Sequence, residues 1–133
     1  MTGITEAKIL WERAVATFED AQAVKHPHSI ANRSYYAAFY AVSALFALED
    51  VAFRKHQQVE AAVHRDLVLP GKWSKELGDG YSSLMEFRTT GDYGIVNSVT
   101  PVEAKEAIEI ARDILKSVHE AHPDIFPLPL DNP

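Results

Sequence analysis

The sequence predicts an all-α protein, an up-and-down bundle of about five helices joined by short connections. Apolar residues recur at steps of three and four over several long segments. The helix-breaking prolines lie between these segments, and no useful run alternates apolar and polar residues as a half-buried strand does. The 133 residues can bury one ordinary core, so we expect a single domain over residues 1–122 and an extended, proline-rich tail over residues 123–133.

The first helix is predicted over residues 4–24, where apolar residues form one stripe opposite a charged face. The stripe consists of Ala7, Leu10, Trp11, Ala14, Phe18 and Ala21. Pro27 separates this helix from the next, because its ring disfavours helical geometry at the residue before it. Ser29 is the predicted N-cap of a second helix over residues 29–50. That helix is apolar nearly all round, so we expect it to be the central helix of the bundle.

A third helix is predicted over residues 56–67, and two interpretations of residues 73–89 stay open. The apolar residues of the second segment favour a helix. Gly78 and Gly80 favour a turn there, because each glycine weakens a helix by about 1 kcal/mol.

The TTGDYG stretch, residues 89–94, is predicted to be a loop, and the helix that follows it is the clearest in the chain. Thr100 is its predicted N-cap and Pro101 suits its first position. Glu103 completes a capping box with Thr100. Pro123 is expected to end this helix.

Composition narrows the classes of function. The absence of cysteine excludes disulfides, thiolate metal sites and a cysteine nucleophile, and it suits a cytoplasmic location. The net charge of −6 opposes broad attraction to nucleic acid, so any RNA contact needs a local basic patch. No signal peptide or membrane-spanning run is evident. The six histidines lack a metal-ligand spacing, so we expect neither a metal nor a cofactor.

The second helix carries one arginine among its apolar residues. Arg33, Tyr36, Ala37 and Tyr40 are spaced to share one face of that helix. Two roles for Arg33 stay open. It could be an architectural arginine, buried and paired with a carboxylate from another helix, or it could line a groove or subunit contact where it meets phosphate.

The stretch NRSYYAAFYAVSALF, residues 32–46, resembles the signature helix of the HEPN family. The similarity is to a branch of small stand-alone proteins with a pattern like R-x-Y-Y-A-x-F-H. The matching residues are Arg33, Tyr35, Tyr36, Ala37 and Phe39. The histidine of the pattern is replaced by Tyr40.

Two further stretches resemble the same family in the same order. RKHQQVEAAVHRDLV is similar to its K-x-H segment, with His56 at the histidine. KELGDGYSSLMEFRTTGDYG is similar to a helix that ends in R-x-x-G-D-Y, matched by Arg88, Gly91, Asp92 and Tyr93. The resemblance covers about residues 5–118, and the three motifs together favour a continuous helix through both glycines.

The resemblance implies a helical bundle that pairs as a homodimer. Many members are metal-independent ribonuclease toxins encoded with a small nucleotidyltransferase antitoxin, so RNA and such an antitoxin are the implied partners. In those toxins an arginine and a histidine of the signature helix meet their dimer mates across a cleft. The implied catalytic residues are Arg33 and Tyr40, and the candidate binding residues are Asn32, Tyr36, His56, Asp92 and Tyr93.

Because Tyr40 replaces the histidine, three hypotheses about function remain open. A phenol is a poor general base at pH 7, and the loss of a positioned acid-base group costs about 10²–10⁴-fold in rate. The first hypothesis is therefore a binding or toxin–antitoxin-like component with weak or no ribonuclease activity. The second is an active endoribonuclease that uses Arg33 with Tyr40 or His56. The third is a small-ligand or nucleotide pocket lined by Tyr36, Tyr40 and Trp73.

Overall fold

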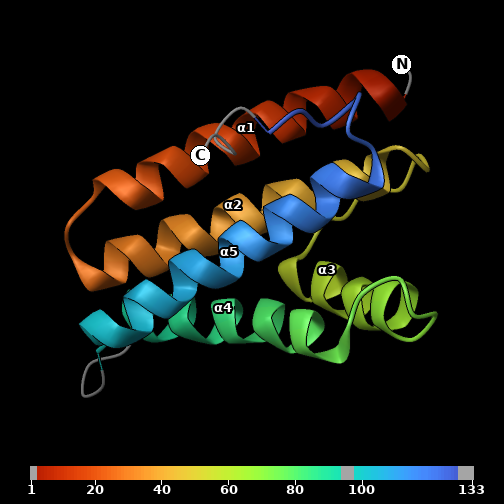
Figure 1. Ribbon diagram of the computed structural model, residues 1–133. Coiled ribbons are helices and arrows are strands. Elements are labelled where there is room, and N and C mark those ends of the chain that lie inside the picture. The colour runs from red at the N-terminus through yellow and green to blue at the C-terminus, as the bar shows by residue number, and fades with distance from the viewer. Residues whose placement is uncertain (1–2, 94–97, 129–133) are drawn as a thin grey trace.

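The computed structural model describes residues 3–93 and 98–128, with the side chains of residues 91–93 outside that description. This part of the chain forms five α-helices and one π-helix (Figure 1). They are α1 (Gly3–Ala23), α2 (Pro27–Ala47), α3 (His56–Ala62), the π-helix η1 (Val63–Val68), α4 (Lys75–Tyr93) and α5 (Pro101–Ala121). The all-α prediction is confirmed.

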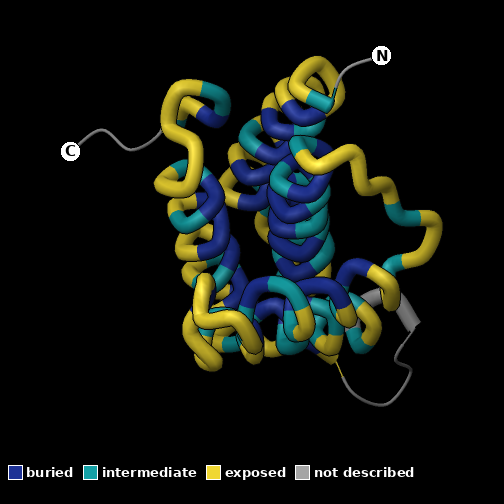
Figure 2. The backbone as a smooth tube through the Cα atoms, turned by 90° about the vertical axis from the view of Figure 1, so that its right-hand side faces the viewer, coloured by how far each residue is buried: buried dark blue, intermediate teal, exposed yellow. Residues whose placement is uncertain are grey.

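Helix α2 is the centre of the bundle, as its apolar composition predicts. It packs against α1, α4 and α5, and its first neighbour in sequence, α1, covers its full length (Figure 1). Six of its fully or almost fully buried residues are alanines, which let the neighbouring helices approach closely: Ala31, Ala37, Ala38, Ala41, Ala44 and Ala47. Figure 2 shows the buried side of each helix turned toward this centre.

The N-terminus of α2 differs from the prediction, because Pro27 and not Ser29 begins the helix. His26 is the N-cap residue, with an extended backbone at φ −77° and ψ 133°. Proline fits the first helical position because its fixed φ is already helical and its missing N–H is not needed there. The predicted cap at Ser29 is therefore wrong.

The third helix is shorter than predicted and continues in a different geometry. It ends at Ala62, and Val63–Val68 follow as the π-helix η1. The Leu69 backbone N–H donates to the His64 carbonyl oxygen at 3.0 Å, five residues back.

Helix α4 is continuous through both glycines, so the turn interpretation is wrong. A Cβ atom at Gly78 would overlap the Val68 side chain, and one at Gly80 would lie 3.0 Å from Ile110. The two glycines therefore let α4 lie close to η1 and to α5, and this packing outweighs their low helix propensity. The helix also extends through Thr89 to Tyr93, so the loop prediction is wrong for residues 89–93.

Helix α5 begins as predicted. The Glu103 N–H donates to Thr100 Oγ1 at 3.1 Å, and the Thr100 N–H donates to Glu103 Oε1 at 3.0 Å, which is the capping box. After α5 the chain folds back toward α1. Phe126 is fully buried against Trp11, whose indole N–H donates to the Pro127 carbonyl oxygen at 2.6 Å. The last five residues of the predicted tail, 129–133, lie outside the described residues.

Candidate functional site

Arg33 lies on α2 with a half-buried side chain whose partner is a neutral amide. Its Nε and Nη2 atoms donate to Asn32 Oδ1 at 3.0 and 2.6 Å, and its Cζ atom lies 5.4 Å from the centre of the Tyr36 ring. No carboxylate of the described residues lies within 4.0 Å of it. This geometry speaks against the architectural role, in which Arg33 is ion-paired inside one bundle.

A second arginine reaches the same phenol ring from α4. Arg88 Nη2 donates to the Tyr36 hydroxyl at 3.2 Å, and its Cζ atom lies 5.5 Å from the centre of the Tyr36 ring and 5.6 Å from that of Tyr35. Two positively charged guanidinium groups thus contact the Tyr36 ring, although the chain as a whole has a net charge of −6. The sequence motifs do not place Arg88 in the site, although it is the arginine of the matched R-x-x-G-D-Y segment.

His56 begins α3 and joins this cluster of residues from a third helix. Its ring centre lies 5.7 Å from that of Tyr36 and 4.6 Å from that of Phe39. Burial lowers the pKa of His56, and the positive charge of Arg88 lowers it further. Neutral His56 is therefore the form present at pH 7.

The Tyr35 hydroxyl determines which ring nitrogen of neutral His56 carries the proton. The Tyr35 hydroxyl and His56 Nδ1 are 2.6 Å apart, and burial raises the pKa of Tyr35 to about 12. The phenol therefore keeps its proton and can donate it to Nδ1. Neutral histidine then carries its own proton on Nε2, which makes that atom a hydrogen-bond donor.

Tyr40 lies one step further along α2, beside a different arginine. Its ring centre is 6.1 Å from that of Tyr36, and the Cζ atom of Arg13 on α1 lies 5.3 Å from it. Tyr40 and Arg13 line a shallow pocket of about 230 Å³ with Phe53 and other residues. Tyr40 is thus at the edge of the cluster and is separated from Arg33 by Tyr36.

The structure therefore brings together four of the predicted site residues, Asn32, Arg33, Tyr36 and His56, and adds Arg88 to them. We call these five residues the arginine cluster. Asp92 and Tyr93 lie in the last turn of α4, and their side chains are outside the described part of the chain.

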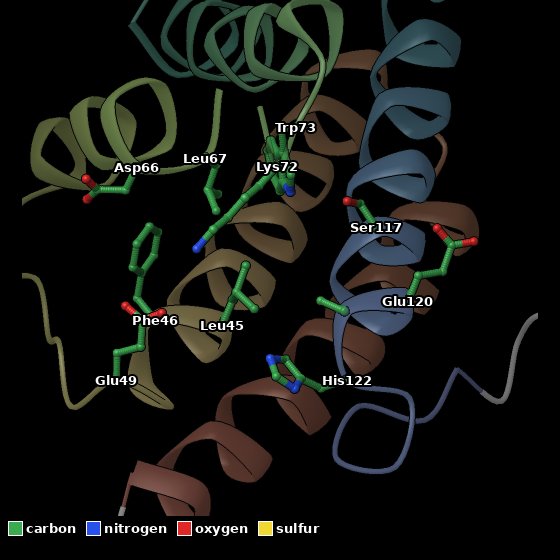
Figure 3. A pocket seen from close by; sticks show the side chains of 11 residues that line it. Leu45, Phe46, Glu49, Asp66, Leu67, Lys72, Trp73, Ser117, Glu120 and His122 are labelled. Atoms are coloured by element: carbon green, nitrogen blue, oxygen red, sulfur yellow. The ribbon is translucent and has the colours of Figure 1, made fainter. Parts of the chain in front are cut away.

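Two of the residues expected to line one pocket, Tyr40 and Trp73, line two different pockets. Trp73 lines a pocket near the end of α2 (Figure 3). Tyr40 lines the one beside Arg13 on α1.

The described residues form neither a metal-binding cluster nor a membrane-spanning helix. No group of three or more histidines and carboxylates among them could hold a metal ion. None of the helices they form has the length and the apolar character needed to cross a bilayer.

Comparison with known families agrees with the motifs and with the bundle. The family model of the HEPN domain matches residues 7–121. The chain belongs to the HEPN family. A relative, a UPF0332 protein of Thermotoga maritima, is 41% identical over 98 residues, which are 74% of each of the two chains. The resemblance drawn from the three motifs is confirmed, and the matched HEPN region contains every residue of the arginine cluster.

Proposed function

We propose that this HEPN protein is a nucleic-acid-associated binding component that holds an RNA phosphate in the arginine cluster and has little or no ribonuclease activity. The observation that carries this proposal is the pair of guanidinium groups on Tyr36, one of which, Arg33, has a neutral amide as its hydrogen-bond partner. Guanidinium groups bind phosphate oxygens through paired, charge-assisted hydrogen bonds.

The neighbouring groups suit the same ligand. His56 Nε2 offers a further donor when Tyr35 donates to Nδ1. Tyr36 offers an aromatic face on which a base or sugar can pack. Because the whole chain is acidic, attraction of an anion depends on this cluster, and binding should weaken with salt by the small amount that one phosphate contact gives.

We expect weak catalysis because the cluster lacks a group that is ready to accept the proton of the ribose hydroxyl. Cleavage at a ribose 2′-hydroxyl needs a group that accepts its proton. Nδ1 of His56 is engaged with Tyr35, and Nε2 carries a proton in that arrangement. Tyr40 lies beside Arg13 at the edge of the cluster, so among the described side chains neither His56 nor Tyr40 offers Arg33 a free proton acceptor.

One observation favours a second candidate, the active metal-independent endoribonuclease. The pKa of His56 is lowered, so its imidazole is neutral at pH 7, which is the form that a general base needs. In this alternative the His56 proton sits on Nδ1, and Nε2 accepts the proton of the ribose hydroxyl while Arg33 stabilises the phosphoryl charge. Tyr40 is the other residue that the alternative could use.

The proposal includes a homodimer in the cytoplasm and a toxin–antitoxin-like pairing with a nucleotidyltransferase. Support for these parts comes from the family, in which an arginine of the signature helix faces its dimer mate. Light scattering tests the dimer directly. A mass of about 14.8 kDa at micromolar concentration contradicts it, and twice that mass supports it.

The function itself is tested with purified protein, a fluorescent single-stranded RNA and chelator, to exclude metal-dependent contaminants. Arg33→Ala and Arg88→Ala should each weaken RNA binding at least tenfold, with Arg112→Ala, an exposed arginine on α5, as the control. Cleavage should stay at background in every protein. Robust cleavage that disappears in Arg33→Ala replaces this proposal with the second candidate. Binding that neither variant weakens refutes both.

A further inference from the structure

A pocket of about 470 Å³ lies at the other end of α2 from the arginine cluster (Figure 3). It is enclosed by the end of α2, by η1, by the segment before α4 and by the last turn of α5. Leu45 is 12 residues beyond Arg33, which is about 18 Å along the helix axis. The pocket is of the size that holds small molecules and is separate from the proposed phosphate site.

One side of the pocket offers hydrogen-bond donors. Trp73 is only 5% exposed, and its indole nitrogen lies on the side of the ring that faces the pocket (Figure 3). Among the described residues, no acceptor is within hydrogen-bond distance of that N–H group. The Lys72 side chain reaches across the pocket, and its ammonium group has no described carboxylate within 4.0 Å. A buried N–H and an ammonium group together favour a carboxylate as ligand.

Negative charge lies at two separate places around the pocket. Glu49 lies just after α2, beside Phe46, whereas Glu120 lies in the last turn of α5 on the opposite side, with its carboxylate pointing away from Lys72 (Figure 3). Helices α2 and α5 both end here, so the negative ends of two helix dipoles add to those carboxylates. Asp66 also lines the pocket, but its two oxygens already accept from Arg65 at 3.0 and 2.8 Å. These groups favour a ligand ammonium.

Part of the pocket wall is an apolar surface formed by Leu45, Phe46 and Leu67 together with the Trp73 ring. Phe46, Leu67 and Trp73 are each 5% exposed. An aliphatic or aromatic side chain of a ligand can be buried here.

We propose that this pocket binds a free amino acid with a large apolar side chain. The ligand carboxylate accepts hydrogen bonds from Trp73 Nε1 and Lys72, its ammonium group meets Glu49, and its side chain packs on Leu45 and Phe46. Only a ligand with charges of both signs meets the donors and this carboxylate at once. This proposal does not depend on the phosphate site, and either can fail without the other.

Titration calorimetry with L-phenylalanine and L-leucine tests the binding. Phenethylamine carries only the ammonium group, 3-phenylpropionate only the carboxylate, and N-acetylphenylalanine amide neither charge. Saturable binding of at least one amino acid is expected, with each analogue at least tenfold weaker. The proposal is overturned by an absence of saturable binding of both amino acids, or by equal affinity for one of the three analogues.

Variants of the donor side locate the site. Trp73→Phe keeps the ring and removes the N–H, and Lys72→Gln removes the charge from an exposed position where folding is not at risk. Each should weaken binding at least fivefold, whereas Lys105→Gln, an exposed lysine on α5 away from the pocket lining, should leave it unchanged. Unchanged affinity in folded Lys72→Gln contradicts the assignment of the ligand carboxylate.

Discussion

The hydrogen bond between Tyr35 and His56 gives the sharpest test of the arginine cluster. Tyr35→Phe removes one oxygen atom from a fully buried side chain and leaves the ring packing in place. The lost bond is short, 2.6 Å, and it joins α2 to the first residue of α3. A neutral hydrogen bond contributes about 1 kcal/mol to the free energy of unfolding. For a chain of 133 residues this corresponds to a fall in Tm of about 3–4 °C.

Tyr81 provides the matched control. It is also a fully buried tyrosine next to Tyr35, with ring centres 6.0 Å apart. Its hydroxyl lies near that of Tyr35 but makes no hydrogen bond of good geometry among the described residues. Removal of an unsatisfied buried hydroxyl is nearly neutral or stabilising. Tyr81→Phe should therefore leave Tm unchanged or raise it slightly, in contrast to Tyr35→Phe.

Thermal unfolding measures both variants, and nitrogen NMR of the His56 ring reads the tautomer. Nε2 should carry the proton in the original protein at pH 7.5. Two results refute the reasoning. Equal losses of stability in the two variants mean that the Tyr81 hydroxyl is hydrogen-bonded as strongly as that of Tyr35, so the bond to His56 has no special weight. A proton on Nδ1 means that His56 is arranged as a base, and it favours the endoribonuclease.

Three other changes test separate parts of the structure. Tyr40→His should raise metal-free RNA cleavage at least tenfold if the rest of the cleft is competent, and a fluorogenic RNA assay in which the rate stays flat contradicts this. Gly78→Ala should lower the free energy of unfolding, measured in urea, by about 1–2 kcal/mol, because the added Cβ atom overlaps the Val68 side chain. Alanine favours helix over glycine, so a gain in stability in this variant refutes the packing argument. Because burial and Arg88 lower the pKa of His56 in the folded state, the unfolded chain binds its proton more readily. Stability should therefore fall as pH drops through the usual histidine range, near 6.5, and His56→Gln should reduce that fall in denaturant unfolding measured at pH 8 and pH 5.5.

The parts of the fold that depend on local rules were predictable from the sequence. The capping box of Thr100 and Glu103 acts within one turn, and the apolar stripe of α1 follows from helix geometry alone. The errors arose where contacts distant in sequence decide the structure. Gly78 has a low helix propensity, and only the contact with Val68 of η1 shows why a residue without a Cβ atom is placed there.

The candidate site likewise has residues that local sequence rules predict and residues that only long-range packing brings in. Arg33 and Tyr36 share a face because four positions on one helix fix their spacing, and the family pattern singled them out. Arg88 could not be placed by spacing, since it is 52 residues from Tyr36 and meets it only because α4 packs on α2. The pocket at the C-terminal end of α2 could not be predicted from the sequence, because its lining comes from four separate segments. Trp73 was noticed as an aromatic residue, but its neighbours could not be inferred.

The isolated charge of Arg33 leads to a last prediction, which needs no RNA. A half-buried guanidinium group with a neutral partner interacts more strongly with an anion than an exposed one does. An oxyanion that binds the folded protein alone stabilises it, by about 2.7 kcal/mol at a concentration 100 times Kd. Sulfate should therefore raise Tm more than chloride of equal ionic strength. Since sulfate also stabilises proteins in general, Arg33→Ala and the exposed control Arg112→Ala are compared. The excess should vanish in Arg33→Ala and persist in Arg112→Ala, and an equal rise in both shows that the cluster does not bind oxyanions.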